Sequence, residues 1–447
     1  MRARPPLTPG PHLVVGLARS GEAAALALRA AGEQVIGCDA GSPQDERLAR
    51  SAGRLSRAGV EVHLDAPGDD LAARARTLIK SPGVPQHAPA VAAARALGVP
   101  VMGELELAWR MLANEFVAVT GTNGKTTTTE WIGHIHRCAG VPVAVAGNVG
   151  TAASSLVGSL APEATVVCEA SSFQLEDTLE FAPEVAVLLN LAPDHLDRHG
   201  SFEAYAAAKL RIFAKQTAQD ISIVPVDLDL ALPGEGRRVR FGAGPQAKLR
   251  REGERLLWDG EPLIGVGELA LPGEHNVLNA MAAAAACMAR GLPAGAVAEG
   301  LAGFSGVAHR LELVCERDGV AYVNDSKATN VASALVALAS FRQPVHLIAG
   351  GRAKGEDFGA LAPAVAAHCA GVYLLGEAAA ELERSLAPAG VPVRVLGDLE
   401  RAVRIAATAA RPGEVVLLSP ACASFDQYRS FEERGEHFRA LARGGDG

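Results

Sequence analysis

The feature that most limits the fold of this chain is a repeated alternation of short β-rich runs and alanine-rich helical stretches. The runs end in glycine or a polar residue, and helical stretches follow them. This alternation is typical of α/β domains, in which crossover helices join parallel strands. We therefore predict an α/β protein with parallel sheets. We expect its ligands at the carboxyl ends of the strands, where the polar loops lie.

The pattern divides into three segments, which suits a chain of 447 residues at roughly 150 residues per domain. A polar stretch over residues 237–263 looks like a hairpin. The predicted domains cover residues 1–103, 104–308 and 309–447. The clearest predicted strands are residues 12–16, 34–39, 77–80, 116–120, 165–168, 185–189, 321–324, 345–348, 371–375, 393–396 and 414–418.

The composition excludes several classes of protein. Apolar residues make up 49% of the chain and charged residues 21%, which is enough apolar surface for folded cores. The formal net charge of −8 argues against binding nucleic acid through bulk charge. We find no signal-peptide pattern and no apolar run long enough to span a bilayer. The seven cysteines form no Cys-x-x-Cys pair, so we expect reduced thiols in the cytoplasm.

Lysine is scarce among the basic residues. Of 42 basic residues, seven are lysines and 35 are arginines. A lysine that persists where arginine is the usual cation is a candidate for chemistry that needs an amine. The alternative is that all seven are ordinary surface residues. They are Lys80, Lys125, Lys209, Lys215, Lys248, Lys327 and Lys354.

The strongest local signal is a glycine-rich loop, residues 119–127, between a predicted buried strand and a predicted helix. Glycines let successive backbone N–H groups face a phosphate, and the start of the helix adds its positive dipole end. Lys125 would reach the β- and γ-phosphates, and the Thr126 hydroxyl would bind Mg²⁺. The generic P-loop has glycine where this chain has Val119. The alternative is a strand-to-helix turn that contains Gly-Lys-Thr by chance.

A second glycine turn, residues 16–21, follows the first predicted strand. It matches the dinucleotide-binding pattern Gly-x-Gly-x-x-Gly except at Ala18. Asp39 lies where a ribose-binding acid stands in such folds. Taken alone, this favours NAD, although Ala18 would crowd a pyrophosphate. A nucleotide diphosphate bound elsewhere in the cleft fits equally well.

Polar residues also end strands further along the chain. Glu169 could face the phosphate loop as a second Mg²⁺ ligand. His195 lies among acids after another strand, where a metal or substrate contact and a structural role are equally compatible. Lys209 lies in an apolar helical context, where the alternative is a lysine that extends to the surface. Three polar loops of the third segment converge on one sheet edge: residues 324–330, 350–355 and 419–426.

Together these motifs resemble the ATP-dependent Mur ligases of peptidoglycan synthesis. The loop over residues 121–126 is similar to the family's variant phosphate loop, which accounts for the missing first glycine. The resemblance implies an N-terminal Rossmann-like domain that binds a UDP substrate, a central P-loop-type ATPase domain with a mostly parallel sheet, and a C-terminal Rossmann-like domain that binds the amino acid. Four further motifs are similar to the members that add D-glutamate: residues 171–176, 194–198, 325–330 and 419–424.

The resemblance also implies roles for the matching residues. The ATP-binding residues are Gly121, Thr122, Asn123, Gly124, Lys125, Thr126, Thr127, Asn279, Arg310 and Asp325. The UDP-substrate residues are Ser20, Gly83, Asn148 and His195, and the D-glutamate residues are Lys327, Thr329, Lys354, Ser424 and Phe431. The ligands of two expected Mg²⁺ ions are Thr126, Glu169, His195 and Lys209 as its carbamate. The catalytic set is Lys125, Glu169, His195 and Lys209.

The activity that the resemblance implies is a two-step ligation in the cytoplasm. ATP phosphorylates the carboxylate of UDP-N-acetylmuramoyl-L-alanine, and the amine of D-glutamate then displaces phosphate from the acyl phosphate. The implied partners are these small molecules, with no nucleic acid and no membrane insertion, and the implied state is a monomer. Two positions depart from the family pattern. Residues 39–41, Asp-Ala-Gly, stand where relatives carry a Thr-Arg pair near the uracil, and Arg19 stands where an apolar residue is usual.

Other interpretations account for part of these motifs. Another Mur ligase or a folylpolyglutamate synthetase shares the phosphate loop, but residues 325–330 and 421–425 speak against both. An NAD(P)-dependent oxidoreductase would use residues 16–21 and Asp39 and would leave the phosphate loop unexplained. A non-catalytic nucleotide-binding module would not need both an ATP site and an acid-binding lysine.

Overall fold

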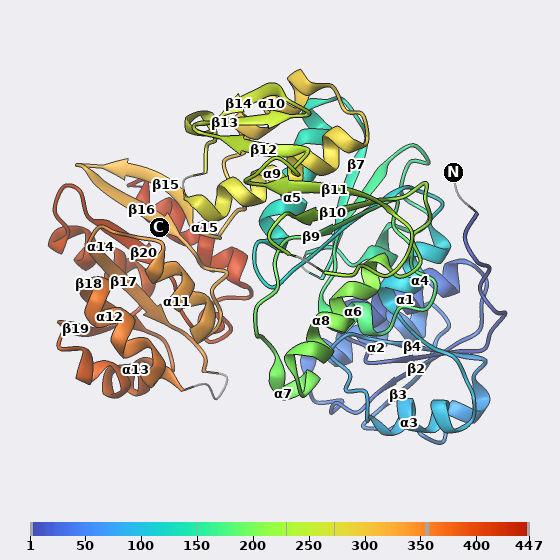
Figure 1. Cartoon of the computed structure of the whole chain (residues 1–447). Coiled ribbons are helices and arrows are strands. Elements are labelled where there is room, and N and C mark those ends of the chain that lie inside the picture. The colour runs from blue at the N-terminus through green and yellow to red at the C-terminus, as the bar shows by residue number, and fades with distance from the viewer. Residues whose placement is uncertain (1–2, 149, 229, 272, 354–356, 445–447) are drawn as a thin grey trace. The chain divides into compact units, whose positions relative to one another are not determined.

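The computed structural model describes residues 3–148, 150–228, 230–271, 273–353 and 357–444. The chain forms three sheets and divides into two compact units between Phe304 and Ser305 (Figure 1). This arrangement confirms the predicted α/β class. The predicted domain boundaries at residues 103 and 308 stay predictions.

The first sheet of the larger unit is parallel, with the strand order β3-β2-β1-β4-β5. Because β1 lies between β2 and β4, the loops after β1 and β4 lie side by side, which is the usual place for a nucleotide in such sheets. The hydroxyl of Ser81, after β4, donates to the carbonyl oxygen of Gly16, after β1, at 2.6 Å. The strands are β1 (His12–Val15), β2 (Val35–Asp39), β3 (Glu61–Leu64), β4 (Thr77–Lys80) and β5 (Val101–Gly103).

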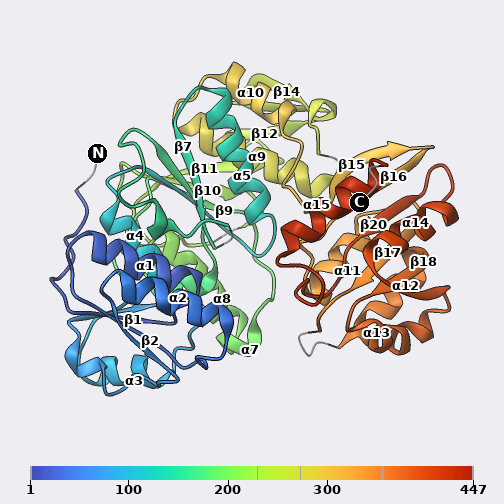
Figure 2. The same cartoon turned by 180° about the vertical axis from the view of Figure 1, so that it is seen from behind.

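Helices cover both faces of this sheet. Successive residues of a strand point to opposite sides, and in β1 both sides carry apolar residues that need cover. Leu13 and Val15 of β1 pack with α3 on one face, and Val14 packs with α1 and α2 on the other. In Figure 1, α3 lies in front of the sheet. In Figure 2, which gives the opposite view, α1 and α2 lie in front of it. The helices are α1 (Arg19–Ala30), α2 (Glu46–Arg57), η1 (Ala72–Arg74) and α3 (Pro89–Ala96).

The second sheet of the larger unit has nine strands in the order β14-β13-β12-β11-β10-β9-β6-β8-β7. It is parallel from β7 to β12 and antiparallel from β12 to β14. The parallel strands are β6 (Phe116–Thr120), β7 (Val143–Gly147), β8 (Thr165–Glu169), β9 (Val185–Leu188), β10 (Ile221–Pro225), β11 (Arg237–Gly242) and β12 (Leu249–Glu252). The last two strands are β13 (Arg255–Trp258) and β14 (Glu261–Gly265).

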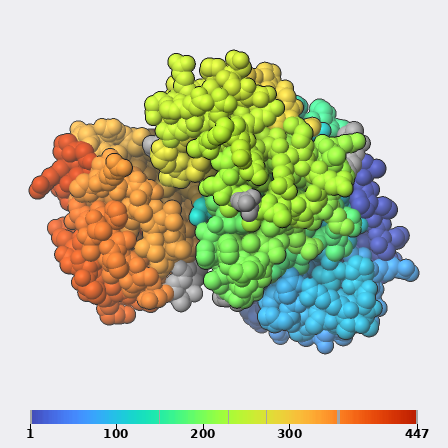
Figure 3. All heavy atoms as spheres, viewed as in Figure 1, coloured from blue at the N-terminus to red at the C-terminus, as the bar shows by residue number. Residues whose placement is uncertain are grey.

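The hairpin-like prediction for residues 237–263 is correct only in part. Strand β11 pairs in parallel with β10, and only β12, β13 and β14 form an antiparallel meander. Two turns of the chain close the meander at Gly253 and Gly260, where φ is positive. The stretch that contains it, coloured yellow-green, forms an outer surface of the larger unit in Figure 3.

The nine-stranded sheet also has a core on each face. Aromatic side chains fill one of them, with Trp109 and Phe116 both edge-on to Phe181. Helices α5 and α9 lie against each other and contact strands of the same sheet, and α10 packs on both. The helices are α4 (Glu104–Met111), α5 (Lys125–Cys138), η2 (Ala153–Leu156), α6 (Ser172–Glu176), α7 (Leu196–His199), α8 (Phe202–Leu210), η3 (Arg211–Phe213), η4 (Val266–Glu268), α9 (Glu274–Ala289) and α10 (Ala294–Gly303).

The smaller unit has a six-stranded sheet in the order β15-β16-β20-β17-β18-β19, which is parallel except for the β15–β16 pair. Helices α11, α12 and α13 cover one face, and α14 and α15 cover the other. Its strands are β15 (Glu312–Arg317), β16 (Val320–Asn324), β17 (Val345–Gly350), β18 (Cys369–Leu375), β19 (Val393–Gly397) and β20 (Val415–Leu418). Its helices are α11 (Val331–Ala339), η5 (Phe358–Leu361), α12 (Ala362–His368), α13 (Ala379–Leu386), η6 (Ala387–Ala389), α14 (Leu399–Ala409) and α15 (Phe431–Ala442).

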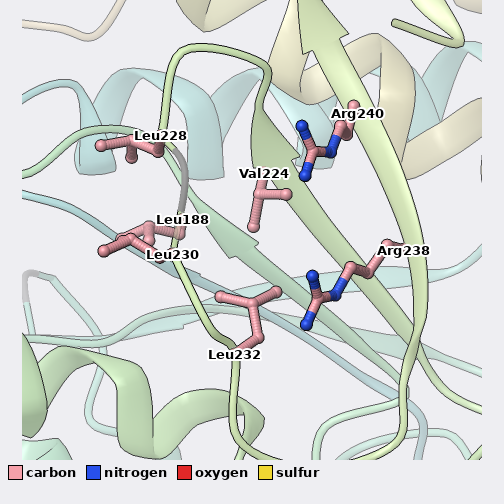
Figure 4. A pocket seen from close by; sticks show the side chains of 7 residues that line it. All are labelled: Leu188, Val224, Leu228, Leu230, Leu232, Arg238 and Arg240. Atoms are coloured by element: carbon pink, nitrogen blue, oxygen red, sulfur yellow. The ribbon is translucent and has the colours of Figure 1, made fainter. Parts of the chain in front are cut away.

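A small apolar pocket lies between the loop after β10 and strand β11 (Figure 4). Leucines of the loop line one wall, and two arginines of β11 line the other. The lining contains none of the predicted site residues; it is Leu188, Val224, Leu228, Leu230, Leu232, Arg238 and Arg240. Among the described residues, no helix is long and apolar enough to cross a membrane.

Candidate active site

The predicted phosphate loop lies between β6 and α5, as its strand-loop-helix pattern requires. Two glycines make its shape possible, with φ of 151° at Gly121 and 82° at Gly124. A Cβ atom at Gly124 would lie 2.2 Å from Oδ1 of Asn279, so the loop packs tightly against helix α9. The backbone N–H groups of Thr122 and Asn123 donate to Oδ1 of Asn190, which follows β9. The asparagine therefore holds the loop from the neighbouring strand.

Thr126 and Glu169 bring an alcohol and a carboxylate together beside this loop. The Thr126 hydroxyl, in the first turn of α5, donates to Oε2 of Glu169 at 2.7 Å. Oε1 of Glu169 accepts from Nδ2 of Asn148 at 3.0 Å. Strands β6 and β8 are neighbours, so their carboxyl ends place these residues at one edge. The Glu169 side chain is buried, with 3% of the residue exposed.

The donor set suits magnesium. Mg²⁺ prefers oxygen ligands and is usually held by one or two carboxylates together with substrate phosphates. The Thr126 hydroxyl and the Glu169 carboxylate are such oxygens, and they lie next to the loop that would hold the phosphates. In the described part of the chain, no three His, Cys, Asp or Glu side chains gather closely enough to hold a metal by themselves. The two oxygens would thus leave positions on the ion for water and substrate phosphates.

Lys125 and Lys209 meet at the carbonyl oxygen of Gly121. Nζ of Lys125 donates to it at 3.0 Å and to the carbonyl oxygen of Thr122 at 2.8 Å. Nζ of Lys209, on α8, donates to the Gly121 oxygen at 2.7 Å. Only 2% of Lys209 is exposed, so this lysine does not extend to the surface. Burial, and then the nearby charge of Lys125, lower the pKa of Lys209 to about 7.

Tyr205 completes this arrangement, and the motif analysis missed it. The Lys209 ammonium lies 4.6 Å from the centre of the Tyr205 ring, and the phenol hydroxyl hydrogen-bonds with the Thr122 hydroxyl at 3.1 Å. Tyr205 and Lys209 are four residues apart on α8, which places them on the same helical face. That spacing was the available signal.

His195 lies apart from the Thr126–Glu169 pair. It adopts a left-handed backbone conformation with φ of 49° as the N-cap of α7. The centre of its ring lies 4.9 Å from the centre of the Phe173 ring, and its Nε2 lies 3.6 Å from Oδ2 of Asp194. Among the described residues, His195 has no hydrogen bond or ion pair with Glu169. The structure therefore places this side chain, which is half exposed, at the rim of the candidate site.

The predicted UDP-substrate residues come from loops of both sheets of the larger unit. Ser20 is the second residue of α1, Gly83 is exposed in the turn after β4, and Asn148 follows β7. The Arg19 guanidinium donates to the backbone oxygen of Asn148 at 3.3 Å. This bond joins the glycine turn of the first sheet to the loop that contacts Glu169.

Asp39 has a role within its own turn. Oδ2 accepts from the backbone N–H of Leu17 at 2.7 Å, and Oδ1 accepts from the backbone N–H of Gly41 at 2.8 Å. The carboxylate thus fixes the loop after β1 against the loop after β2. The Asp39 carboxylate, which would bind a ribose in an NAD-dependent enzyme, therefore binds backbone N–H groups here.

The remaining predicted residues belong to the smaller unit. Oδ2 of Asp325 accepts from the Ser419 hydroxyl at 2.8 Å, and Oδ1 accepts from the backbone N–H of Leu311 at 3.2 Å. Burial raises the pKa of Asp325 to about 7. Arg310 precedes Leu311 and is exposed. Lys354, predicted to bind D-glutamate, lies outside the described residues.

Arg434 holds the loops of the smaller unit together, and the motif analysis missed it. Its guanidinium is fully buried and donates to both oxygens of Ser326, to the carbonyl oxygen of Cys422 and, at 3.5 Å, to that of Gly350. These acceptors lie in the three polar loops at the strand ends. Burial lowers the pKa of Arg434 to about 10, which leaves it charged at neutral pH.

Four D-glutamate candidates lie on or beside these loops. Lys327 follows Ser326, and the backbone N–H of Thr329 donates to the carbonyl oxygen of Lys327 at 2.9 Å. Phe431 begins α15, and its carbonyl oxygen accepts from the Ser326 hydroxyl at 2.8 Å. The Ser424 hydroxyl is buried and has no hydrogen-bond partner among the described residues, which leaves it available for a ligand.

The sequence matches two family models. Residues 119–287 match the Mur ligase middle domain, and residues 309–422 match the Mur ligase glutamate ligase domain. Two relatives are UDP-N-acetylmuramoylalanine–D-glutamate ligases. That of Acidobacterium capsulatum is 43% identical over 96% of this chain and 95% of its own length. That of Pelotomaculum thermopropionicum is 42% identical over 96% of both chains.

Solved structures share the fold at low sequence identity. A UDP-N-acetylmuramate–alanine ligase from Thermotoga maritima has a TM-score of 0.58 and 21% identity, over 97% of this chain and 99% of the other. A pseudomurein peptide ligase type C from Methanothermus fervidus has a TM-score of 0.56 and 16% identity, over 97% and 99%. These similarities support the three-sheet architecture alone.

Proposed function

Because this chain belongs to the Mur ligase family, we propose that it adds D-glutamate to UDP-N-acetylmuramoyl-L-alanine, with ATP as the energy source. The observation that carries the proposal is the arrangement around Gly121, where two lysines share one acceptor beside the Thr126–Glu169 pair. Such a site suits phosphoryl transfer to a carboxylate. From the family membership we infer that ATP and Mg²⁺ are its cofactors, and that its product serves peptidoglycan synthesis and hence cell shape and division.

ATP lies on the phosphate loop, residues 121–127, with Lys125 at the terminal phosphates. Asn279 lies against the loop at Gly124, and the family resemblance assigns it to the nucleotide. The family resemblance assigns Arg310 and Asp325 to ATP as well. The UDP substrate binds along the loops that carry Ser20, Gly83, Asn148 and His195.

Two Mg²⁺ ions would bind here. Thr126 would hold one of them, and Glu169, His195 and a carbamate on Lys209 are the further ligands that the family resemblance implies. When bound, Mg²⁺ supplies positive charge that screens the phosphates. His195 lies at the rim of the site in the structure, so its assignment rests on the family resemblance. The chemistry of the oxygen donors, the Thr126 hydroxyl and the Glu169 carboxylate, supports the first site.

Lys209 carries the carbamate. The neutral amine attacks CO₂, a C–N bond forms as one C–O π bond of CO₂ opens, and Nζ gives one proton to solvent, so the neutral amine becomes a carbamate anion. Two features support this assignment: the side chain is buried beside the phosphate loop, and Lys125 lies next to it. An arginine could not do the same, because a guanidinium stays protonated and is a poor nucleophile.

In the first step, an oxygen of the substrate carboxylate attacks the γ-phosphorus of ATP, and the bond from that phosphorus to the β-phosphate oxygen breaks. ADP leaves, and an acyl phosphate forms. An anion approaching a polyanion is repelled by several kcal/mol in a partly dehydrated site. The Lys125 ammonium and the backbone N–H groups of the loop lower that repulsion.

In the second step, the amine of D-glutamate attacks the acyl carbon, the carbon–oxygen bond to phosphate breaks, and the amine loses a proton. Lys327 and Lys354 pair with the carboxylates of D-glutamate. Thr329, Ser424 and Phe431 complete the binding site. The available Ser424 hydroxyl supports this placement. The protein acts as a cytoplasmic monomer on small molecules and binds no nucleic acid.

The test is phosphate release in the presence of ATP, Mg²⁺ and UDP-N-acetylmuramoyl-L-alanine. We expect release that depends on D-glutamate and a product heavier by one glutamyl group. Equal release with L-glutamate, L-lysine or no amino acid would reject the proposal. Oxidation of NADH by the same protein would favour the oxidoreductase interpretation.

A further inference from the structure

Lys80 is a fully buried lysine that the proposed reaction does not use. It is the last residue of β4, with 0% of the residue exposed. Nζ lies 2.8 Å from Oδ2 of Asp177, whose side chain is 3% exposed. Nζ also donates to the carbonyl oxygen of Val84 at 2.8 Å and to that of Ser81 at 3.4 Å. An ammonium has three hydrogens, and here three oxygens surround it.

Two of these oxygens belong to the turn that carries Gly83. The backbone N–H of Val84 donates to the carbonyl oxygen of Ser81 at 3.0 Å, which closes the turn. The Ser81 hydroxyl ties the start of the turn to Gly16. Lys80 therefore holds both ends of the Gly83 turn from inside the protein, while Gly83 itself is exposed.

The third oxygen belongs to the segment between β8 and β9, two strands of the nine-stranded sheet. Asp177 is the C-cap of α6, the short helix that begins three residues after Glu169. Its Oδ1 accepts from the side chain of Gln86 at 2.9 Å, and its carbonyl oxygen accepts from the backbone N–H of Gly103 at 2.7 Å. The Lys80–Asp177 pair thus joins the Gly83 turn to the helix after Glu169.

A second cation reaches the same turn from the His195 side. The Arg198 guanidinium donates to the carbonyl oxygen of Val84 at 3.4 Å and lies 3.9 Å from Glu176. It also lies 4.2 Å from the centre of the Phe173 ring. Arg198 is on α7, whose N-cap is His195. The carbonyl oxygen of Val84 therefore accepts from two cations, Lys80 and Arg198.

Stability alone gives little reason for a buried ion pair here. Desolvation of two charges can cancel their attraction, and an apolar pair of similar size is often as stable. Burial lowers the pKa of Lys80, and the nearby Asp177 carboxylate opposes that shift. The lowered pKa shows that removing the ammonium from water has a cost that Asp177 only partly offsets. What an apolar pair could not supply is the directed bond to the carbonyl oxygens of the turn.

We propose that Lys80 is a positioning residue for the UDP substrate. It fixes the Gly83 turn relative to α6 and α7, and it does so without touching the substrate, because its side chain is fully buried. This inference rests on the proposed function, since it concerns the substrate loops of that reaction. It also assigns a role to a lysine outside the ATP and D-glutamate sites.

The test compares Lys80→Met with the double variant Lys80→Met/Asp177→Asn. In the single variant, Asp177 is left as a buried unpaired charge, so we expect a lower melting temperature. In the double variant both charges are gone and the melting temperature recovers. Both variants lack the bonds to Val84 and Ser81, so both should bind UDP-N-acetylmuramoyl-L-alanine roughly tenfold more weakly or worse in calorimetry without ATP.

ATP binding separates a positioning role from a general structural one, because general damage to the fold would weaken ATP binding as well. We expect the Kd for ATP, measured without the UDP substrate, to stay at the wild-type value in the double variant. Lys215→Met is the matched control, because Lys215 forms an exposed pair with Glu180 at 2.9 Å. It should change neither melting temperature nor binding.

A double variant that binds the UDP substrate as well as the wild type would overturn the inference. An equal loss of ATP affinity would also overturn it, because the defect would then be general. If the double variant does not fold, the same comparison is made with Lys80→Gln, which keeps a donor but no charge. Binding is measured without D-glutamate, so a wild type that binds the UDP substrate but fails the phosphate-release test rejects only the proposed function.

Discussion

Lys125 and Lys209 donate to one acceptor, the carbonyl oxygen of Gly121, at 3.0 and 2.7 Å. Two ammonium groups at one oxygen repel each other, and a deprotonated amine relieves that repulsion. Lys209 is the more buried of the two, and its pKa is lowered to about 7. Near neutral pH, a large share of Lys209 is therefore the neutral amine that can react with CO₂.

Lys209→Ala should lose activity by roughly 100-fold, since a ligand of the site is removed. Acetate or another short carboxylate should restore part of it by replacing the carbamate oxygen. Lys209→Arg should stay inactive with or without acetate, because the guanidinium fills the space. Phosphate release is the measurement, and a fully active Lys209→Arg variant would contradict the carbamate assignment.

The same pKa predicts how the wild type responds to pH. Below about 7 the Lys209 amine is mostly protonated and cannot form a carbamate, so activity should fall as the pH is lowered through that value. Added bicarbonate should reduce the loss, because it raises the CO₂ concentration. An activity that is insensitive to bicarbonate at low pH would contradict the prediction.

Gly124→Ala should weaken ATP binding by tenfold or more, about 1.4 kcal/mol or above. The new Cβ would lie 2.2 Å from Oδ1 of Asn279, which forces the loop and α9 apart. Gly98→Ala is the control, because Gly98 has a similar φ of 70° and open space around it. Both variants carry the backbone cost of about 1–2 kcal/mol, but only Gly124→Ala should raise the Kd for ATP.

Arg434→Met should destabilise the smaller unit and raise the KM for D-glutamate. It leaves the buried carbonyl oxygens of Ser326 and Cys422 without their donor, at about 1–3 kcal/mol each. The loops that Arg434 joins carry the D-glutamate candidates, so their relative positions should loosen. Chemical denaturation and steady-state kinetics measure the two effects.

Arg439→Met is the control on the same helix. Arg439 pairs with Glu312 at 2.6 Å at a partly exposed position, and such pairs contribute about 1 kcal/mol or less. We expect a small change in stability and an unchanged KM for D-glutamate. A KM that rises equally in both variants would show that Arg434 has no special role in the loops.

Asp325→Asn should raise the melting temperature of the smaller unit at high pH. The pKa of Asp325 is raised to about 7 in the folded protein, above its usual value. Its contribution to stability is therefore fully present below the usual carboxyl pKa of 3.8 and is lost as the pH rises from there through about 7. Thermal scans at about pH 5 and about pH 8 should show a larger gain for the variant at the higher pH. A gain that is equal at both values would reject the assigned pKa.

The eleven strands predicted from the sequence are present, because each is a short apolar run bounded by glycine or polar residues, but β3, β5, β7, β10 and β15 are not among them. Residues 237–263 are predicted only in part: β11 has the polar alternation of a hairpin strand, but it pairs in parallel with β10. Which neighbour a strand chooses depends on the packing of α9 and on the loop after β10. Neither is encoded in the local pattern.

The phosphate loop was predictable because its chemistry lies within nine consecutive residues. The Thr126–Glu169 bond followed from strand ends that meet at one edge. The Lys80–Asp177 pair was not predictable, because its partners are distant in sequence and a buried lysine has no local signature. Arg434 was hidden in a polar helix, where only the spacing of Phe431 and Phe438 indicated that its face is buried.

Because Lys209 bonds to the carbonyl oxygen of Gly121 through an N–H group, its charge can change while that bond is kept. A carbamylated Lys209 keeps one hydrogen on Nζ, and that hydrogen can still reach the Gly121 oxygen. The loop would therefore keep its conformation on the proposed carbamylation, while a cationic or neutral amine becomes an anion that attracts Lys125. Carbamylation would then change the electrostatics of the ATP site without moving the backbone that holds it.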